Sequence, residues 1–248
     1  MAANLAINNK EMEYAKQIIT SRNKSADYLK TTIWDFELAQ IKLSHLELAE
    51  AIVHLQQFIS NFKGKFYLKD VYLKLAWCYY LQGNMNAAEI NRKNVIKKGA
   101  ADSDADKKAL KEAKTGIWPN TLLLKTRLLN DGGYNKEALA LMAGKSSNDF
   151  GNPAEQLEFA YRYARILDDI GSKDAAVKAY DVAIALGKNR TEHYAARAAL
   201  QTGMIYEEKG QKQKAIEYYE LCIAMDDHDY KNSIDQRAKA GIERCKGR

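Results

Sequence analysis

The chain has 248 residues, 46% of them hydrophobic, and its 38 Lys and Arg against 32 Asp and Glu give a formal net charge of +6. These proportions are ordinary for a soluble folded protein. No run approaches the roughly 18 consecutive apolar residues of a membrane-spanning helix, so membrane insertion is not expected. With only 2 Pro and 14 Gly, and with abundant Ala, Leu, Lys and Glu, the composition favours helices over strands.

The first residues, MAANLAINNKEMEY, lack the basic and then apolar pattern of a secretory signal. As given, the chain is therefore expected in the cytoplasm. A periplasmic or exported location stays open if it is a fragment of a longer chain. Residues 5–21 are amphipathic and predict a single leading helix without a partner.

A glycine followed five residues later by an alanine recurs along the chain. Glycine can end a helix in the left-handed conformation, and an early alanine in the next helix allows the two helices to approach closely. Such a spacing predicts a repeated helical hairpin. The pairs are Gly83 with Ala88, Gly133 with Ala138, Gly171 with Ala176, and Gly210 with Ala215.

A further hairpin is expected before these, because Ala39 and Ala51 are twelve residues apart although Leu46 occupies the place of the glycine. From Ala51 onward the second-helix alanines are separated by 37, 50, 38 and 39 residues. The step of 50 predicts an insertion at 101–117 that contains one short helix. The expected units are about 31–64, 69–100, 118–145, 155–189 and 194–228, followed by a capping helix at 230–245.

This pattern resembles the tetratricopeptide repeat, whose units have about 34 residues. The resemblance implies an all-α fold, a right-handed superhelical solenoid that forms one domain over residues 1–248. The family's proline near the end of each unit is absent, since Ala100, Lys188 and Asp227 stand there. Residues 65–145 also resemble the C-terminal half of longer bacterial proteins of this family.

In this family the first helices of successive repeats line a concave groove, which implies a set of partner-binding residues here. Aromatic residues and arginines carry much of the binding energy at protein interfaces. A groove of these residues is expected to hold a peptide or helix of acidic character. Burial of Trp77 and Tyr161 in ordinary packing between repeats stays open as an alternative. The predicted residues are Phe36, Trp77, Tyr80, Arg127, Tyr161, Arg165 and Arg197.

The sequence offers no catalytic, cofactor or metal motif. Asp102, Asp104 and Asp106 are spaced like the start of a calcium loop, but Lys107 and Ala113 stand where that loop requires Gly and Glu. The aspartates are therefore interpreted as the start of a helix. No enzyme activity, cofactor or metal is expected.

We therefore expect a non-catalytic scaffold or adaptor for protein–protein interaction. One alternative is an accessory helical module of a longer exported or envelope-associated protein, which would act as a spacer or in oligomerisation. A third alternative is an RNA-binding helical repeat. From Tyr230 onward there are six basic residues against Asp235 and Glu243, a surplus of +4 out of the net +6. Most of the excess positive charge therefore lies in the C-terminal segment, and nucleic acid is not the expected partner.

Overall fold

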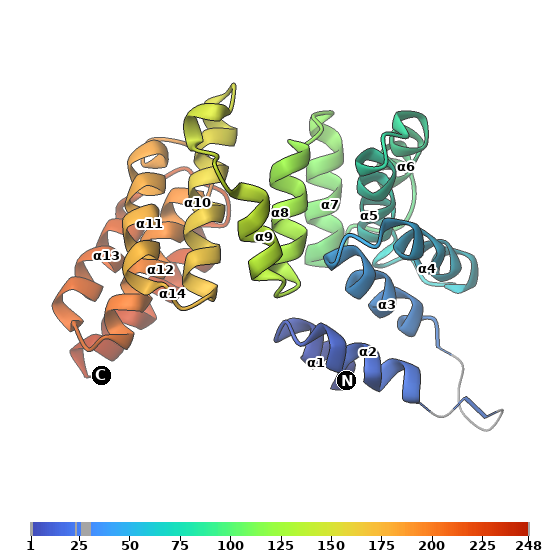
Figure 1. Ribbon diagram of the computed structural model, residues 1–248, viewed down its shortest axis with the longest axis horizontal. Helices are drawn as coiled ribbons and strands as arrows, with labels where there is room; N and C mark the ends of the chain where they lie inside the picture. Colours follow the sequence, from blue (N-terminus) through green and yellow to red (C-terminus); the bar gives the residue numbers. More distant parts are fainter. Residues whose placement is uncertain (1, 23, 26–30, 248) are drawn as a thin grey trace. The chain divides into compact units, whose positions relative to one another are not determined.

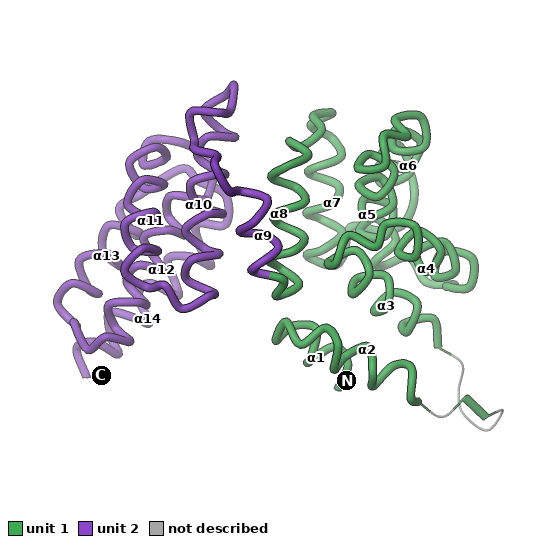
Figure 2. The backbone as a smooth tube through the Cα atoms, in the orientation of Figure 1, with its two compact units in different colours: residues 1–134 green, residues 135–248 purple. Residues whose placement is uncertain are grey.

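The computed structural model describes residues 2–22, 24–25 and 31–247, and every regular element in those ranges is a helix (Figure 1). The predicted all-α fold of repeated helical hairpins is confirmed. The chain divides into two compact units, unit 1 at residues 1–134 and unit 2 at residues 135–248 (Figure 2). The prediction of one continuous solenoid stays a prediction.

The helices of unit 1 are α1 (Ala2–Asn8), α2 (Met12–Ser21), α3 (Ile33–Ser44), α4 (Leu48–Asn61), α5 (Leu68–Leu81), α6 (Met85–Lys97), α7 (Asp104–Thr115) and α8 (Thr121–Asp131). Unit 1 consists of the helical pairs α1–α2, α3–α4 and α5–α6, followed by the two helices α7 and α8. The helix α7 lies inside the segment 101–117 and packs against α5 and α6.

The N-terminal segment differs from its prediction, since residues 5–21 form parts of two helices rather than one. Lys10 adopts a left-handed φ of 64°, and the N–H of Glu11 donates to the carbonyl of Ala6 at 2.9 Å. This bond closes the end of α1 as a glycine turn would. The hairpin α1–α2 then buries small apolar side chains against Ile41 of α3. The leading segment is thus paired, and the sequence lacked a glycine to indicate its turn.

The next two hairpins follow the predicted pattern. Leu46, which replaces the turn glycine between α3 and α4, also takes a positive φ of 61°, while Gly83 between α5 and α6 has a φ of 80°. Ala51 and Ala88, the small residues early in the second helices, are fully buried. The same turn is therefore made by leucine in one hairpin and by glycine in the next.

The additional helix α7 is fastened to the start of α5 by Asp106. Its buried carboxylate accepts hydrogen bonds from the backbone N–H groups of Tyr67 at 2.7 Å, Lys69 at 3.0 Å and Asp70 at 3.2 Å. These donors have no partner within their own helix, so Asp106 caps α5 from a distance in sequence. Ser103 caps α7 itself, which agrees with the interpretation of the acidic cluster as a helix start.

Unit 2 is built in the same way around one core that extends from α10 to α14. The Tyr180 hydroxyl donates to Asp168 at 3.2 Å, and the Tyr219 hydroxyl donates to Glu207 at 2.6 Å. Both bonds join the two helices of a hairpin and link residues 12 positions apart. The elements are α9 (Asn135–Met142), η1 (Ser147–Asp149), α10 (Pro153–Asp169), α11 (Lys173–Gly187), α12 (Tyr194–Glu208), α13 (Lys212–Ala224) and α14 (Lys231–Lys246).

Candidate partner-binding surface

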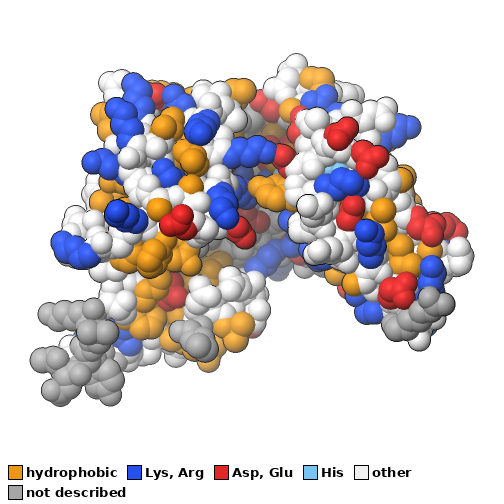
Figure 3. All heavy atoms as spheres, turned by 180° about the vertical axis from the view of Figure 1, so that it is seen from behind, with side chains coloured by type: hydrophobic (Ala, Val, Ile, Leu, Met, Phe, Trp, Pro, Cys, Tyr) orange, Lys and Arg blue, Asp and Glu red, His pale blue; other side chains and the backbone are white. Residues whose placement is uncertain are grey.

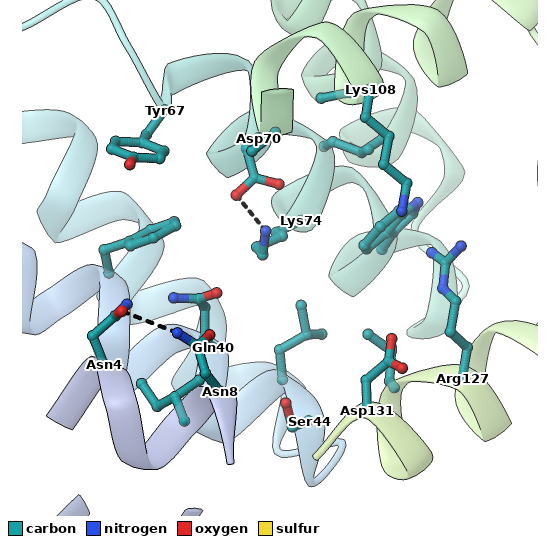
Figure 4. A pocket seen from close by; sticks show the side chains of 18 of the residues that line it. Asn4, Asn8, Gln40, Ser44, Tyr67, Asp70, Lys74, Lys108, Arg127 and Asp131 are labelled. Carbon is teal, nitrogen blue, oxygen red and sulfur yellow. Dashed lines mark hydrogen bonds and ion pairs between the residues drawn. The ribbon is translucent and has the colours of Figure 1, made fainter. Parts of the chain in front are cut away.

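Unit 1 contains a cavity of about 590 Å³ between α1, α3, α5, α7 and α8 (Figure 4). This volume is typical of a site that holds a small ligand or a few side chains. Phe36 of α3, Trp77 of α5 and Arg127 of α8 all line it. Three of the predicted binding residues, each from a different helix of unit 1, therefore come together.

Trp77 is held by contacts on two sides. Its indole Nε1 donates to Glu112 Oε1 of α7 at 2.9 Å, and the Arg127 guanidinium carbon lies 4.5 Å from the ring centroid. A cation over an indole face contributes about 0.5–2 kcal/mol, depending on desolvation. Trp77 is only 8% exposed. It packs against its neighbours and also forms part of the cavity wall, and a role for it in binding stays a prediction.

Charged side chains form the remaining walls. Lys74 pairs with Asp70, and its Nζ lies 5.6 Å from the centroid of the Phe36 ring. Arg127 has no ion pair with any residue that the structure describes, and its buried Nη2 lacks a hydrogen-bond partner there. An unsatisfied buried donor is costly, so an acceptor from a ligand would be favourable at this point.

The other predicted aromatic residues are outside this cavity. Tyr80 stacks on Trp118 with the ring centroids 4.8 Å apart, and its hydroxyl donates to the carbonyl of Pro119 at 2.9 Å. Tyr161, in unit 2, is only 3% exposed and lies against the rings of Tyr180 and Tyr194. Both side chains are thus used in packing, and a role for them in binding stays a prediction.

The two predicted arginines of unit 2 differ from each other. Arg165 lies 3.3 Å from the Asp169 carboxylate one turn further along α10. Arg197 of α12 has a buried Nε without a hydrogen-bond partner among the residues that the structure describes. In the right half of Figure 3, which shows unit 2, acidic and basic side chains are interspersed rather than gathered in a stripe of one sign.

The last helix, α14, is rich in Lys and Arg and uses part of this charge in ion pairs within the unit. Arg244 binds both carboxylate oxygens of Glu207 at 2.8 and 2.9 Å, and this pairing, with the Tyr219 hydroxyl, lowers the pKa of Glu207. Lys231 pairs with Asp226 and Asp235. The Arg244 pair fastens α14 to α12 of the preceding hairpin, whereas Asp235 lies within α14 and Asp226 just before it.

Several residues that line the cavity were not predicted from the sequence. Asn4 and Asn8 come from α1, whose position over the cavity depends on a turn that the sequence did not indicate. Lys108 comes from the inserted helix. Asp131 could have been found, because it follows the predicted Arg127 by one turn of α8 and shares its face (Figure 4).

Comparison with protein families identifies the repeats. Residues 196–229, which cover most of α12 and α13, match a model described as tetratricopeptide repeat, and residues 70–90, in α5 and the start of α6, match another with that description. These two matches support the assignment to the tetratricopeptide repeat family that the glycine and alanine spacing indicated. No protein in a search of curated proteins matches the chain.

Among solved structures, the chain is similar to the tetratricopeptide repeat domain of P58(IPK), with 14% identity and a TM-score of 0.41 over 99% of this chain. It spans 63% of that domain's length. It is also similar to the TPR2AB domain of yeast Sti1, described in complex with pHSP90, with 12% identity, a TM-score of 0.38, and coverage of 98% of this chain and 95% of that one.

The tetratricopeptide repeat is in general a non-catalytic module for protein–protein interaction. Within the described ranges, no helix is long and apolar enough to cross a membrane. The same ranges contain no cluster of three or more His, Cys, Asp or Glu that could hold a metal ion.

Proposed function

We propose that this protein is an interaction scaffold that receives a segment of a partner protein, a peptide or a helix, in the cavity of unit 1. The observation that carries the proposal is the meeting of Phe36, Trp77 and Arg127 around one concave space. Aromatic side chains and arginines in such a place provide large contact areas and directed hydrogen bonds.

The cavity combines an apolar wall with polar groups at its edge, as binding pockets commonly do. Leu73 and Leu128 are buried and line it together with the aromatic rings. Gln40 and Ser44 of α3 provide uncharged polar groups in the lining (Figure 4). An amphipathic segment could place apolar side chains against the leucines and polar ones against α3.

We further propose that Arg165 and Arg197 provide a second contact surface on unit 2. Both side chains are partly exposed. Arg197 has the stronger support, because its Nε is without an acceptor among the described residues, whereas Arg165 lies beside Asp169.

The proposal is tested by filling the cavity rather than by removing its walls. Gln40→Trp places a large side chain in the space, and Gln57→Trp makes the same change at an exposed position of α4 outside the cavity. Partners are captured from lysate of the native host with each variant, after both are shown to unfold cooperatively. We expect Gln40→Trp alone to lose a partner that the unchanged protein recovers. Equal recovery by both variants would contradict the proposal.

A further inference from the structure

Two opposite charges on α8 face the cavity of unit 1 without being paired to each other. Arg127 and Asp131 lie one helical turn apart and both line the space (Figure 4). Neither forms an ion pair with any residue in the described part of the chain. An arginine that precedes an acidic residue by four positions is the less favourable order for a pair along a helix. The Arg127 guanidinium instead lies over Trp77.

The other charges around the cavity have partners. Lys74 pairs with Asp70, and Glu112 accepts the hydrogen bond from Trp77. Lys10 and Lys108 also have interaction partners. The charges left for a ligand are therefore one cation and one anion, both on the same face of one helix.

We infer that the segment bound in this cavity carries an acidic and a basic side chain about 6 Å apart along the helix axis, the rise of four helical residues, beside an apolar side chain. The acidic group meets Arg127, the basic group meets Asp131, and the apolar group packs against Leu128, which also lines the cavity from α8. This inference rests on the proposed function and specifies the chemistry of the partner.

Charge complementarity favours such a mixed segment over a purely acidic one. A carboxylate can bind the edge of the Arg127 guanidinium while the face of that group stays on Trp77. A second carboxylate one turn away would lie against Asp131, and like charges at an interface oppose binding. The same argument with the signs exchanged disfavours a purely basic segment. Because Arg127 and Asp131 carry opposite charges, they also favour one of the two orientations in which a segment could lie along α8.

The test uses four fluorescein-labelled, alanine-based helical peptides with leucines on one face. Two carry Glu and Lys four residues apart, in opposite orders, one carries two Glu, and one carries two Lys. Binding to the unchanged protein is measured by fluorescence anisotropy. We expect one of the mixed peptides to bind at least about tenfold more tightly than the other three, since a tenfold change in affinity is within the reach of one or two close charge pairs.

Single neutralisations then assign each contact through double-mutant cycles. In Arg127→Gln, replacing the peptide's Glu by Gln should no longer weaken binding. In Asp131→Asn, replacing the peptide's Lys by Gln should no longer do so. Lys125→Gln, on the same helix but outside the cavity, is the matched control and should leave the peptide preference unchanged. Thermal unfolding of each variant verifies that the fold is intact.

Tightest binding of the peptide with two Glu would overturn the inference and make this a site for anions. Equal binding of all four peptides, or no binding of any, would overturn it as well. The proposed function is judged separately by Gln40→Trp. If that variant loses the native partner while the peptides show no charge preference, the cavity binds a partner whose chemistry is not the one inferred here.

Discussion

Replacement of Gly241 by alanine should destabilise unit 2, although alanine is the better helix former. The Tyr219 ring is fully buried between Gly203 of α12 and Gly241 of α14. A Cβ at Gly241 would lie 2.5 Å from the ring Cζ, and a Cβ at Gly203 would lie 2.6 Å from its Cδ1. The Tyr219 hydroxyl is held by Glu207 at 2.6 Å. The ring therefore has little room to move away from either helix.

The magnitude follows from two opposing effects. Alanine in a helix interior is favoured over glycine by about 1 kcal/mol. Carbon atoms prefer separations of about 3.5–4.0 Å, so the new methyl group is about 1 Å too close to the ring. Such overpacking costs about 1–3 kcal/mol and sometimes more. Because the ring is confined on both sides, we expect a cost in the upper part of this range, about 2–3 kcal/mol, and thus a net loss of about 1–2 kcal/mol in the free energy of unfolding.

The assay is urea unfolding of Gly241→Ala followed by circular dichroism, with the same substitution repeated in a Tyr219→Leu background. In that background the added methyl group no longer meets a ring, so alanine should become neutral or stabilising. Gly151→Ala is the control, because nothing lies within 4 Å of a Cβ there and φ is not left-handed. A stabilised Gly241→Ala single variant would refute the reasoning, since it would show that the ring can move.

Two further predictions concern side chains that join helices. Asp106→Asn should lower the free energy of unfolding by about 2 kcal/mol, because hydrogen bonds from the start of α5 lose their charged acceptor. Asp102→Asn, at an exposed position, is the control. An equal urea midpoint for the two variants would contradict the role of Asp106 as the cap of α5. Arg244 and Tyr219 donate hydrogen bonds to Glu207 and so lower its pKa. The contribution of the ionised Glu207 to stability is therefore fully present above the ordinary Glu pKa of about 4.3, and it is lost as the pH falls through the lowered pKa. The free energy of unfolding of Glu207→Gln should therefore fall less steeply with decreasing pH than that of the unchanged protein. Identical acid-unfolding curves for the two proteins would count against this role of Glu207.

The hairpins could be predicted because their signals are local. A turn glycine and an alanine five residues later report backbone geometry and close packing within one hairpin, and both are visible in the sequence. The turns at Lys10 and Leu46 were harder, since these residues adopt a left-handed conformation without being glycine. For Leu46 the alanine spacing compensated, whereas around Lys10 no such spacing was available.

The candidate site could be predicted only in part, for a related reason. Phe36, Trp77 and Arg127 were found because they occupy equivalent faces of successive first helices. Which aromatic residue stays at the cavity and which packs elsewhere depends on neighbours distant in sequence. Tyr80, for example, stacks on Trp118, which follows the inserted segment. The contribution of α7 to the cavity could not be inferred, because an insertion has no equivalent in the other repeats.

The attachment of α7 limits how the repeat array can be shortened. Residues 101–117 interrupt the regular spacing, and a designer who wished to make the repeats uniform would delete them first. That deletion would also remove Asp106 from the start of α5 and Glu112 from the Trp77 indole. The preceding repeat thus depends on the inserted segment for its stability. A shortened protein without residues 101–117 should require a new N-cap for α5 and a new hydrogen-bond partner for Trp77.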